Sequence, residues 1–168
     1  MVLNALILVL FPALMAFAAS SDLLTMTISN KLVIGLAVGF FVMAFLLGLS
    51  AAEIGNHLAA GAVVLTVAFF CFARGWIGGG DAKIAAAIAL WFGFEQVLNY
   101  LLCASLLGGV LTWLMLKFRS EPLPPALARY AWIARLHEAD AGVPYGIALA
   151  AAALIIYPDT VFMQKIAL

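Results

Sequence analysis

The chain has 168 residues, of which 67% are hydrophobic and only 10% are charged. Soluble globular domains are about 45–50% apolar and about 25% charged, so this composition excludes a soluble domain and indicates an integral membrane protein. Eight basic and eight acidic residues give a formal net charge of zero, which offers no reason to expect a nucleic-acid partner. The first apolar run has no basic segment before it and further apolar runs follow, so we do not expect a secretory precursor.

Six apolar runs approach the length of about 20 helical residues that crosses a bilayer. They cover residues 2–19, 32–49, 58–73, 81–94, 97–116 and 143–157. Asn30 is a candidate N-cap for the second span, and residues 50–57 are expected to form a turn before the third. The sequence thus predicts an all-α integral membrane protein with six transmembrane helices, joined mostly by short loops, in a single membrane-embedded domain over residues 1–168.

A longer polar loop, residues 117–141, separates the fifth and sixth spans. Leu127, Tyr130 and Ala134 fall near helical spacing, and Trp132 prefers a membrane interface, which favours a short helix lying on the membrane surface. A solvated connector accounts for the same composition equally well.

The two cysteines, Cys71 and Cys103, both lie inside apolar runs. Neither has a CxxC or His/Cys neighbour, so the sequence predicts neither a zinc site nor a disulfide framework. Free cysteine is often buried, and we interpret both as small core residues.

Basic residues indicate the orientation of the chain in the membrane. In the six-span arrangement only Lys165 falls on one side, and seven basic residues fall on the other: Lys31, Arg74, Lys83, Lys117, Arg119, Arg129 and Arg135. An excess of lysine and arginine marks the cytoplasmic side. The loop of residues 117–141 is therefore expected in the cytoplasm, and both chain termini outside.

Two aspartates are expected at this cytoplasmic face. Asp81 follows three glycines, Gly78 to Gly80, at the start of the fourth span, and Asp22 ends the first span. Two complete spans separate them, so both lie on the same side and can converge if spans one and four pack together. The fourth span is shorter than the hydrocarbon core, which places Asp81 in a thinned or water-filled region.

Paired carboxylates predict acid–base chemistry. Like charges a few ångströms apart cannot both stay ionised, so one carboxylate serves as the base that activates water and the other as the acid. His57 and His137 fall on opposite faces, which leaves no Ser/His/Asp set. Two carboxylates alone would underfill a metal site, so no metal and no cofactor is expected.

Other interpretations of these residues remain open. An aspartate at a helix N-terminus often serves only as a cap, and three glycines can form a simple tight turn. A small proton-coupled transporter would also place acids at helix ends, although no inverted repeat is visible. A non-enzymatic assembly factor for a membrane complex is a further alternative.

The residues around Asp81 support further expectations. Glycines at 78–80 would let a substrate backbone approach the aspartate, would adopt φ values that other residues resist, and would allow hinge motion. Lys83 lies two residues beyond Asp81, about 200° around a helix of 3.6 residues per turn. We therefore expect Lys83 to have a structural or lipid-binding role rather than to pair with Asp81.

Several of these motifs together resemble the type IV prepilin peptidases, a family of GxGD membrane aspartic proteases. Gly78-Gly79-Gly80-Asp81 followed by Ala82-Lys83-Ile84 resembles the family's GxGDxK pattern, which singles out Gly78, Gly80 and Lys83 beside the aspartate. Asp22 with the downstream Ile28-Ser29-Asn30 resembles the segment of the first catalytic aspartate. Pro144-Tyr145-Gly146 resembles the opening of the family's last helix.

The resemblance implies a reaction and a set of site residues. Asp22 and Asp81 would be the catalytic dyad, and Asn30, Pro144, Tyr145 and Gly146 would contribute to substrate binding. The substrates would be type IV prepilins or pseudopilins, as in the small family members that process Flp-type pilins. The enzyme would remove a short basic leader, usually after a glycine, at the cytoplasmic face of the bacterial inner membrane, while the apolar segment of the substrate stays in the lipid bilayer.

One departure from the larger family members bears on a second activity. Those members carry an N-terminal cytoplasmic insert with two CxxC pairs and also methylate the new N-terminus. This chain has neither the insert nor a CxxC pair. The comparison therefore implies cleavage without S-adenosylmethionine-dependent methylation.

Overall fold

The computed structural model describes the backbone of residues 2–167 and the side chains of residues 3–165. Within that part of the chain the regular structure is entirely helical, which confirms the predicted all-α class. In chain order the elements are α1 (Val2–Thr25), α2 (Asn30–Leu46), α3 (Ala51–Ala73), α4 (Gly79–Ser120), α5 (Pro125–Ala128), α6 (Ala131–His137), α7 (Tyr145–Ile156), the 3-10 turn η1 (Tyr157–Asp159) and α8 (Val161–Ala167).

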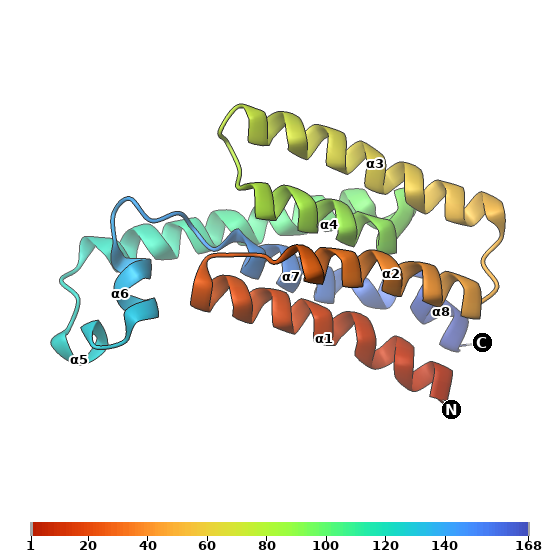
Figure 1. The fold of residues 1–168 in the computed structure, drawn as a ribbon, viewed down its shortest axis with the longest axis horizontal. Coiled ribbons are helices and arrows are strands. Elements are labelled where there is room, and N and C mark those ends of the chain that lie inside the picture. Colours follow the sequence, from red (N-terminus) through yellow and green to blue (C-terminus); the bar gives the residue numbers. More distant parts are fainter. Residues whose placement is uncertain (1, 168) are drawn as a thin grey trace.

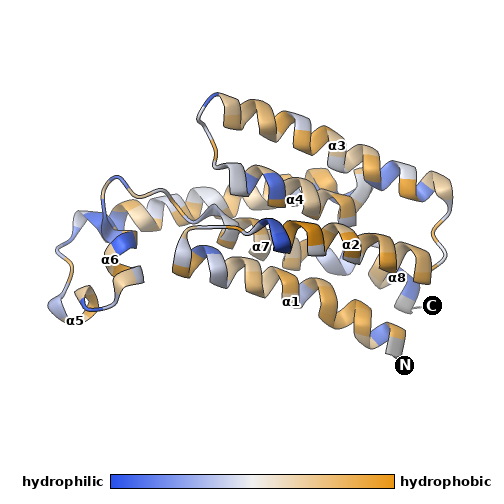
Figure 2. Cartoon of the chain, in the orientation of Figure 1, coloured by the Kyte–Doolittle hydropathy of each residue, from blue (hydrophilic) through white to orange (hydrophobic). Residues whose placement is uncertain are grey.

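Four helical stretches are long and apolar enough to cross a membrane, as expected for an integral membrane protein. They are Leu3–Thr25, Ala51–Ala73, Gly79–Ser120 and Tyr145–Lys165, and α2 is a shorter apolar helix of 17 residues. Apolar residues cover most of these helices in Figure 2, whereas polar residues gather around α5 and α6. The count of six transmembrane helices stays a prediction.

The long helix α4 consists of two segments. Its 42 residues would extend about 63 Å as one straight helix at about 1.5 Å per residue, roughly twice the thickness of a hydrocarbon core. Gly93 interrupts it with φ 59° and ψ −175°, which are not helical values. The chain doubles back there, so residues 79–92 and 94–120 run in opposite directions (Figure 1).

Two side chains of α3 fix this reversal. The Asn56 Oδ1 accepts a hydrogen bond of 2.9 Å from the Phe94 backbone N–H, and the His57 Nδ1 lies 2.7 Å from the Leu90 carbonyl oxygen. A Cβ atom at Gly93 would lie only 2.8 Å from the Asn56 Oδ1. The reversal therefore needs glycine both for its positive φ and for the space that the α3 side chains occupy.

The predicted turn at residues 50–57 is wrong, because α3 already begins at Ala51. The Ser50 hydroxyl accepts a hydrogen bond of 3.2 Å from the Glu53 N–H, and the Glu53 carboxylate accepts one of 2.6 Å from the Ser50 N–H. This reciprocal pair is a capping box, whose Ser-x-x-Glu signature is visible in the sequence. The polar residues that resembled a turn are thus the first two turns of a helix.

The boundaries of the first two spans also differ from the prediction. Helix α1 continues through the polar residues after residue 19 and ends at Thr25, because the hydroxyls find partners within the helix. The Ser20 Oγ donates to the Ala16 carbonyl at 2.8 Å. The cap of α2 is Ser29, whose Oγ accepts from the Leu32 N–H at 3.3 Å, so Asn30 is the first helical residue rather than the cap.

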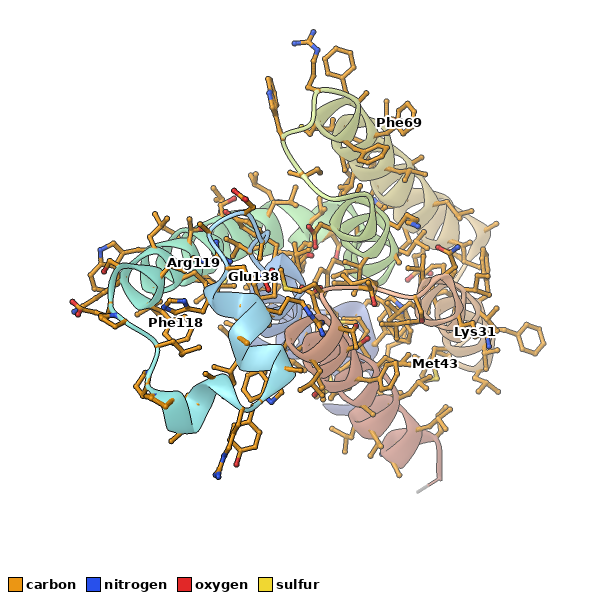
Figure 3. The ribbon with its side chains drawn as sticks, turned by 60° about the vertical axis from the view of Figure 1, so that its left-hand side comes forward. Lys31, Met43, Phe69, Phe118, Arg119 and Glu138 are labelled. Atoms are coloured by element: carbon orange, nitrogen blue, oxygen red, sulfur yellow. The ribbon has the colours of Figure 1, made fainter. Side chains whose placement is uncertain are left out.

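The polar loop of residues 117–141 folds into two short helices, α5 and α6, instead of a single surface helix. The α6 segment is attached to the bundle rather than freely solvated. Arg119 at the end of α4 donates hydrogen bonds of 2.8 Å to the carbonyls of Leu136 and Gly142, and points toward α6 in Figure 3. Arg135 of α6 donates to the Leu24 carbonyl at the end of α1, at 3.1 Å.

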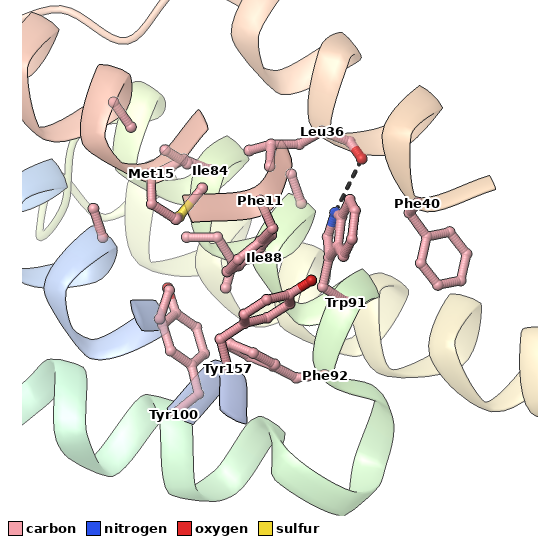
Figure 4. Packing of buried hydrophobic residues seen from close by; sticks show 14 of the residues in the cluster. Phe11, Met15, Leu36, Phe40, Ile84, Ile88, Trp91, Phe92, Tyr100 and Tyr157 are labelled. Carbon is pink, nitrogen blue, oxygen red and sulfur yellow. Dashed lines mark hydrogen bonds between the residues drawn. The ribbon is translucent and has the colours of Figure 1, made fainter. Parts of the chain in front are cut away.

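An aromatic cluster joins α1, α2, α4 and η1 inside the bundle (Figure 4). Phe11 of α1 packs against Trp91 of α4, with ring centroids 4.9 Å apart, and stacks on Tyr157 at 4.5 Å. The buried Trp91 Nε1 donates to the Leu36 carbonyl of α2 at 3.0 Å. These contacts fix the position of α1 relative to α4, and hence of the residues at their ends.

We expect Gly93→Ala to lower the free energy of unfolding by at least about 2 kcal/mol, because alanine would adopt a positive φ and would also meet Asn56. Thermal unfolding of the purified protein in detergent measures the change. The matched control is Gly109→Ala in the second segment of α4, where a Cβ atom meets nothing within 4 Å. Equal melting temperatures for the two variants would contradict the role assigned to Gly93.

Candidate active site

A polar cavity of about 650 Å³ lies at the end of the bundle where α1 ends and α4 and α7 begin. Both Asp22 and Asp81 line it. The rest of its wall comes from the loop after α1, the glycine-rich loop before α4, and the segment that leads into α7. Two carboxylates that are 59 positions apart in the sequence therefore face one cavity.

Asp22 occupies the last turn of α1 and is only 5% exposed. Its Oδ2 accepts a hydrogen bond of 2.7 Å from the backbone N–H of Gly146, in the first turn of α7. A Cβ atom at Gly146 would lie 2.8 Å from that same oxygen and 3.0 Å from the Asp22 Cγ. Glycine at 146 thus allows the helix backbone to approach the carboxylate closely enough to donate to it.

Asp81 lies in the first turn of α4, three residues after the N-cap Gly78. Its carboxylate turns back toward the cap, since a Cβ atom at Gly78 would lie 2.9 Å from the Asp81 Oδ2. The next two glycines are also in tight places: a Cβ atom at Gly79 would lie 3.2 Å from the Phe72 ring, and one at Gly80 would lie 3.3 Å from the Ile28 Cβ. A side chain at any of the three positions would therefore meet a neighbouring group, although Gly78 itself is exposed.

The unusual φ values predicted for these glycines are not found, whereas their hinge motion stays a prediction. Gly78 has φ −70° and ψ 146°, values that any residue adopts, and the positive-φ glycines are Gly48, Gly75 and Gly93. What the stretch requires is the absence of side chains, because the Asp81 carboxylate, Phe72 and Ile28 already fill the space around it.

The helix α7 brings the two aspartates to one place. It packs along both α1 and α4, whereas α1 and α4 meet mainly through large side chains such as Phe11 and Trp91. The sequence argument made convergence conditional on packing of spans one and four, and it did not foresee that α7 packs against both. Asp22 and Asp81 thus line the same cavity, one at the end of α1 and the other at the start of α4.

Lys83 and Asn30 form a link between two helices beside the cavity. The Lys83 Nζ donates a hydrogen bond of 2.8 Å to the Asn30 Oδ1, which connects the start of α4 to the start of α2. Lys83 lines the cavity, whereas Asn30 is held by the lysine. Both residues are exposed, and only Lys83 is part of the cavity wall.

Pro144 and Tyr145 fix the start of α7. Pro144 is its N-cap, and Tyr145 lines the cavity with its side chain against the second segment of α4. The Tyr145 hydroxyl is 2.7 Å from the Thr112 Oγ1, and a Cβ atom at Gly108 would lie 2.7 Å from the Tyr145 ring. Sequence reasoning missed Gly108 and Thr112, although a glycine and a hydroxyl inside an apolar span were a usable signal.

Basic residues surround this end of the bundle. The seven that the sequence placed on one side of the membrane lie in or beside the segments at this end of the bundle, and Lys83 lines the cavity itself: Lys31, Arg74, Lys83, Lys117, Arg119, Arg129 and Arg135. Lys165 lies at the other end, where its Nζ donates to the Leu47 carbonyl at 3.3 Å. Within the described part of the chain, no cluster of three or more His, Cys, Asp or Glu residues could hold a metal ion.

A protein-family model described as the type IV leader peptidase family matches residues 9–113. This match covers more than half of the chain and includes both Asp22 and Asp81, whereas Gly146 lies beyond it. The chain therefore belongs to the type IV leader peptidase family. No curated protein and no solved structure matches it.

We expect Gly146→Ala to reduce cleavage of a leader-peptide substrate by about 100-fold, because the added methyl group would displace the Asp22 carboxylate from its donor. Cleavage rates in detergent or vesicles measure the loss. The control is Gly142→Ala in the same cavity wall, where a Cβ atom would meet only the Met26 Cε at 3.7 Å. Similar rates for the two variants would contradict the positioning role of Gly146.

Proposed function

We propose that this member of the type IV leader peptidase family is a membrane aspartic endopeptidase, with Asp22 and Asp81 as its catalytic dyad. Family membership indicates a protease. The observation that carries the aspartic mechanism is the shared cavity, whose wall contains both carboxylates. That arrangement supplies both a base and an acid without any other nucleophilic side chain.

The proposed mechanism uses one proton shared by the dyad. The ionised carboxylate removes a proton from the attacking water, while the protonated carboxylate donates its proton to the oxygen of the scissile carbonyl. The tetrahedral intermediate then collapses, and the proton taken from water passes to the leaving amine. The Gly146 N–H holds Asp22 in position through this cycle, and Asp81 is carried by the first turn of α4.

The proposed substrates are type IV prepilins or pseudopilins of the Flp kind, cut at the end of a short basic leader. The cavity lies at the end of the bundle that carries seven of the eight basic residues, which supports cleavage at the cytoplasmic face. We place the chain in the bacterial inner membrane, with both termini on the periplasmic side. The apolar segment of the substrate would stay in the lipid bilayer beside the enzyme.

Replacing either aspartate by asparagine keeps its shape but removes the acid–base function. We expect Asp22→Asn and Asp81→Asn each to lower cleavage of a co-expressed prepilin by about 10²–10⁴-fold. A mobility shift of the substrate on a gel measures the reaction. Asp140→Asn, in the exposed loop before α7, is the matched control and should cleave like the wild type.

Cleavage that persists in both dyad variants would contradict the aspartic mechanism. If pilus assembly also persisted in those variants, a non-enzymatic assembly factor would become the better explanation. Proton-coupled transport by the wild-type chain in liposomes would identify the transporter alternative.

The absence of a CxxC insert leads us to propose cleavage without N-methylation. The new N-terminus of the product should therefore carry an unmodified amino group after incubation with S-adenosylmethionine. Mass spectrometry of the mature N-terminal peptide distinguishes this from a product heavier by one methyl group. A methylated product made by the purified chain would contradict the proposal.

A further inference from the structure

Tyr100 in the second segment of α4 carries a polar atom in an unusual position. Its side chain is 0% exposed and packs against Phe92, with ring centroids 5.1 Å apart. Among the side chains of residues 3–165, the Tyr100 hydroxyl is the single buried polar atom without a hydrogen-bond partner. Buried hydroxyls are nearly always paired, because leaving one unpaired is costly.

The other polar aromatic groups of the same cluster are paired. The Tyr157 hydroxyl donates to the Ile7 carbonyl at 2.9 Å, and the Trp91 Nε1 donates to the Leu36 carbonyl at 3.0 Å. The cluster can therefore satisfy a buried donor from a helix carbonyl. A phenylalanine would fill the volume of Tyr100 without leaving a donor unpaired, so the hydroxyl calls for a reason other than packing.

The direction of the side chain points to that reason. The Tyr100 ring extends from the second segment of α4 toward Met15 and Ile88 (Figure 4). Met15 lies on the face of α1 that carries Asp22, and Ile88 lies on the face of α4 that carries Asp81, each seven residues or about two turns away. The Tyr100 side chain is thus directed into the space between α1 and α4, on the inner faces that carry Asp22 and Asp81.

We propose that Tyr100 is a positioning residue for the dyad. Its hydroxyl is unpaired in the free enzyme and donates a hydrogen bond to the Asp81 carboxylate when the site closes in a step after substrate binding. This role rests on the proposed function. The unpaired hydroxyl makes the free state less stable, and the new hydrogen bond removes that cost in the closed state. The interaction therefore favours the geometry of the reaction and not the initial binding of substrate.

The test is Tyr100→Phe, which removes one oxygen atom and keeps the ring. The substrate is a reporter with a short basic leader, a glycine, an apolar helix of about 20 residues and a soluble tag, cleaved by the purified full chain in detergent. We expect kcat to fall about tenfold with KM unchanged. The melting temperature should stay the same or rise, because no hydrogen bond of the free enzyme is lost.

Tyr157→Phe is the matched control from the same aromatic cluster. It removes a hydroxyl that is paired in the free enzyme, so it should lower the melting temperature and leave kcat unchanged. Tyr100→Phe should therefore lower kcat without lowering the melting temperature, whereas Tyr157→Phe should lower the melting temperature without lowering kcat.

Three results would overturn the role of Tyr100. The first is an unchanged kcat in Tyr100→Phe, and the second is a change in that variant that is confined to KM. The third is a fall in kcat in Tyr157→Phe equal to that in Tyr100→Phe, accompanied by a lower melting temperature of Tyr157→Phe. Failure of the wild-type chain to cleave the reporter would contradict the proposed function instead, so the two failures are distinguishable.

Discussion

The hydrogen bond from the Gly146 N–H to the Asp22 carboxylate joins two segments that are 124 positions apart in the sequence. A carboxylate buried in an apolar bundle is costly unless it has a donor, and a helix N-terminus supplies one together with a favourable dipole. Because the donor is a backbone group, the whole of α7 must lie against α1. The same placement packs α7 against α4, so this contact acts together with the Phe11–Trp91 packing to fix the positions of both aspartates.

Space, rather than backbone freedom, explains the glycines around the site. Gly146 leaves room for Asp22, Gly78 leaves room for Asp81, and Gly80 leaves room for Ile28 of the loop after α1. Each is a place where two chain segments approach more closely than a side chain would permit. The cavity thus combines a few polar side chains with glycines that leave room for them.

The sequence predicted the parts of the fold that depend on composition and on counting spans. Asp22 and Asp81 could be assigned to one end of the bundle because two apolar runs separate them, and a hydrophobic run is a strong local signal. The role of α7 as the link between α1 and α4 could not be predicted, since it depends on contacts such as Gly146 with Asp22 that leave no local pattern. The start of α3 was missed although the Ser50 and Glu53 signature was present, because polar residues next to an apolar run resemble a turn.

The reversal at Gly93 also determines which side of the bundle every later segment reaches. If residues 79–120 ran in one direction as a single helix, α7 would start at the end opposite to Asp22, and Gly146 could not meet the carboxylate. One glycine, held by Asn56 and His57, therefore determines at which end of the bundle each later segment begins. An insertion machinery that threaded this stretch straight across would produce a protein with both aspartates intact and no assembled site.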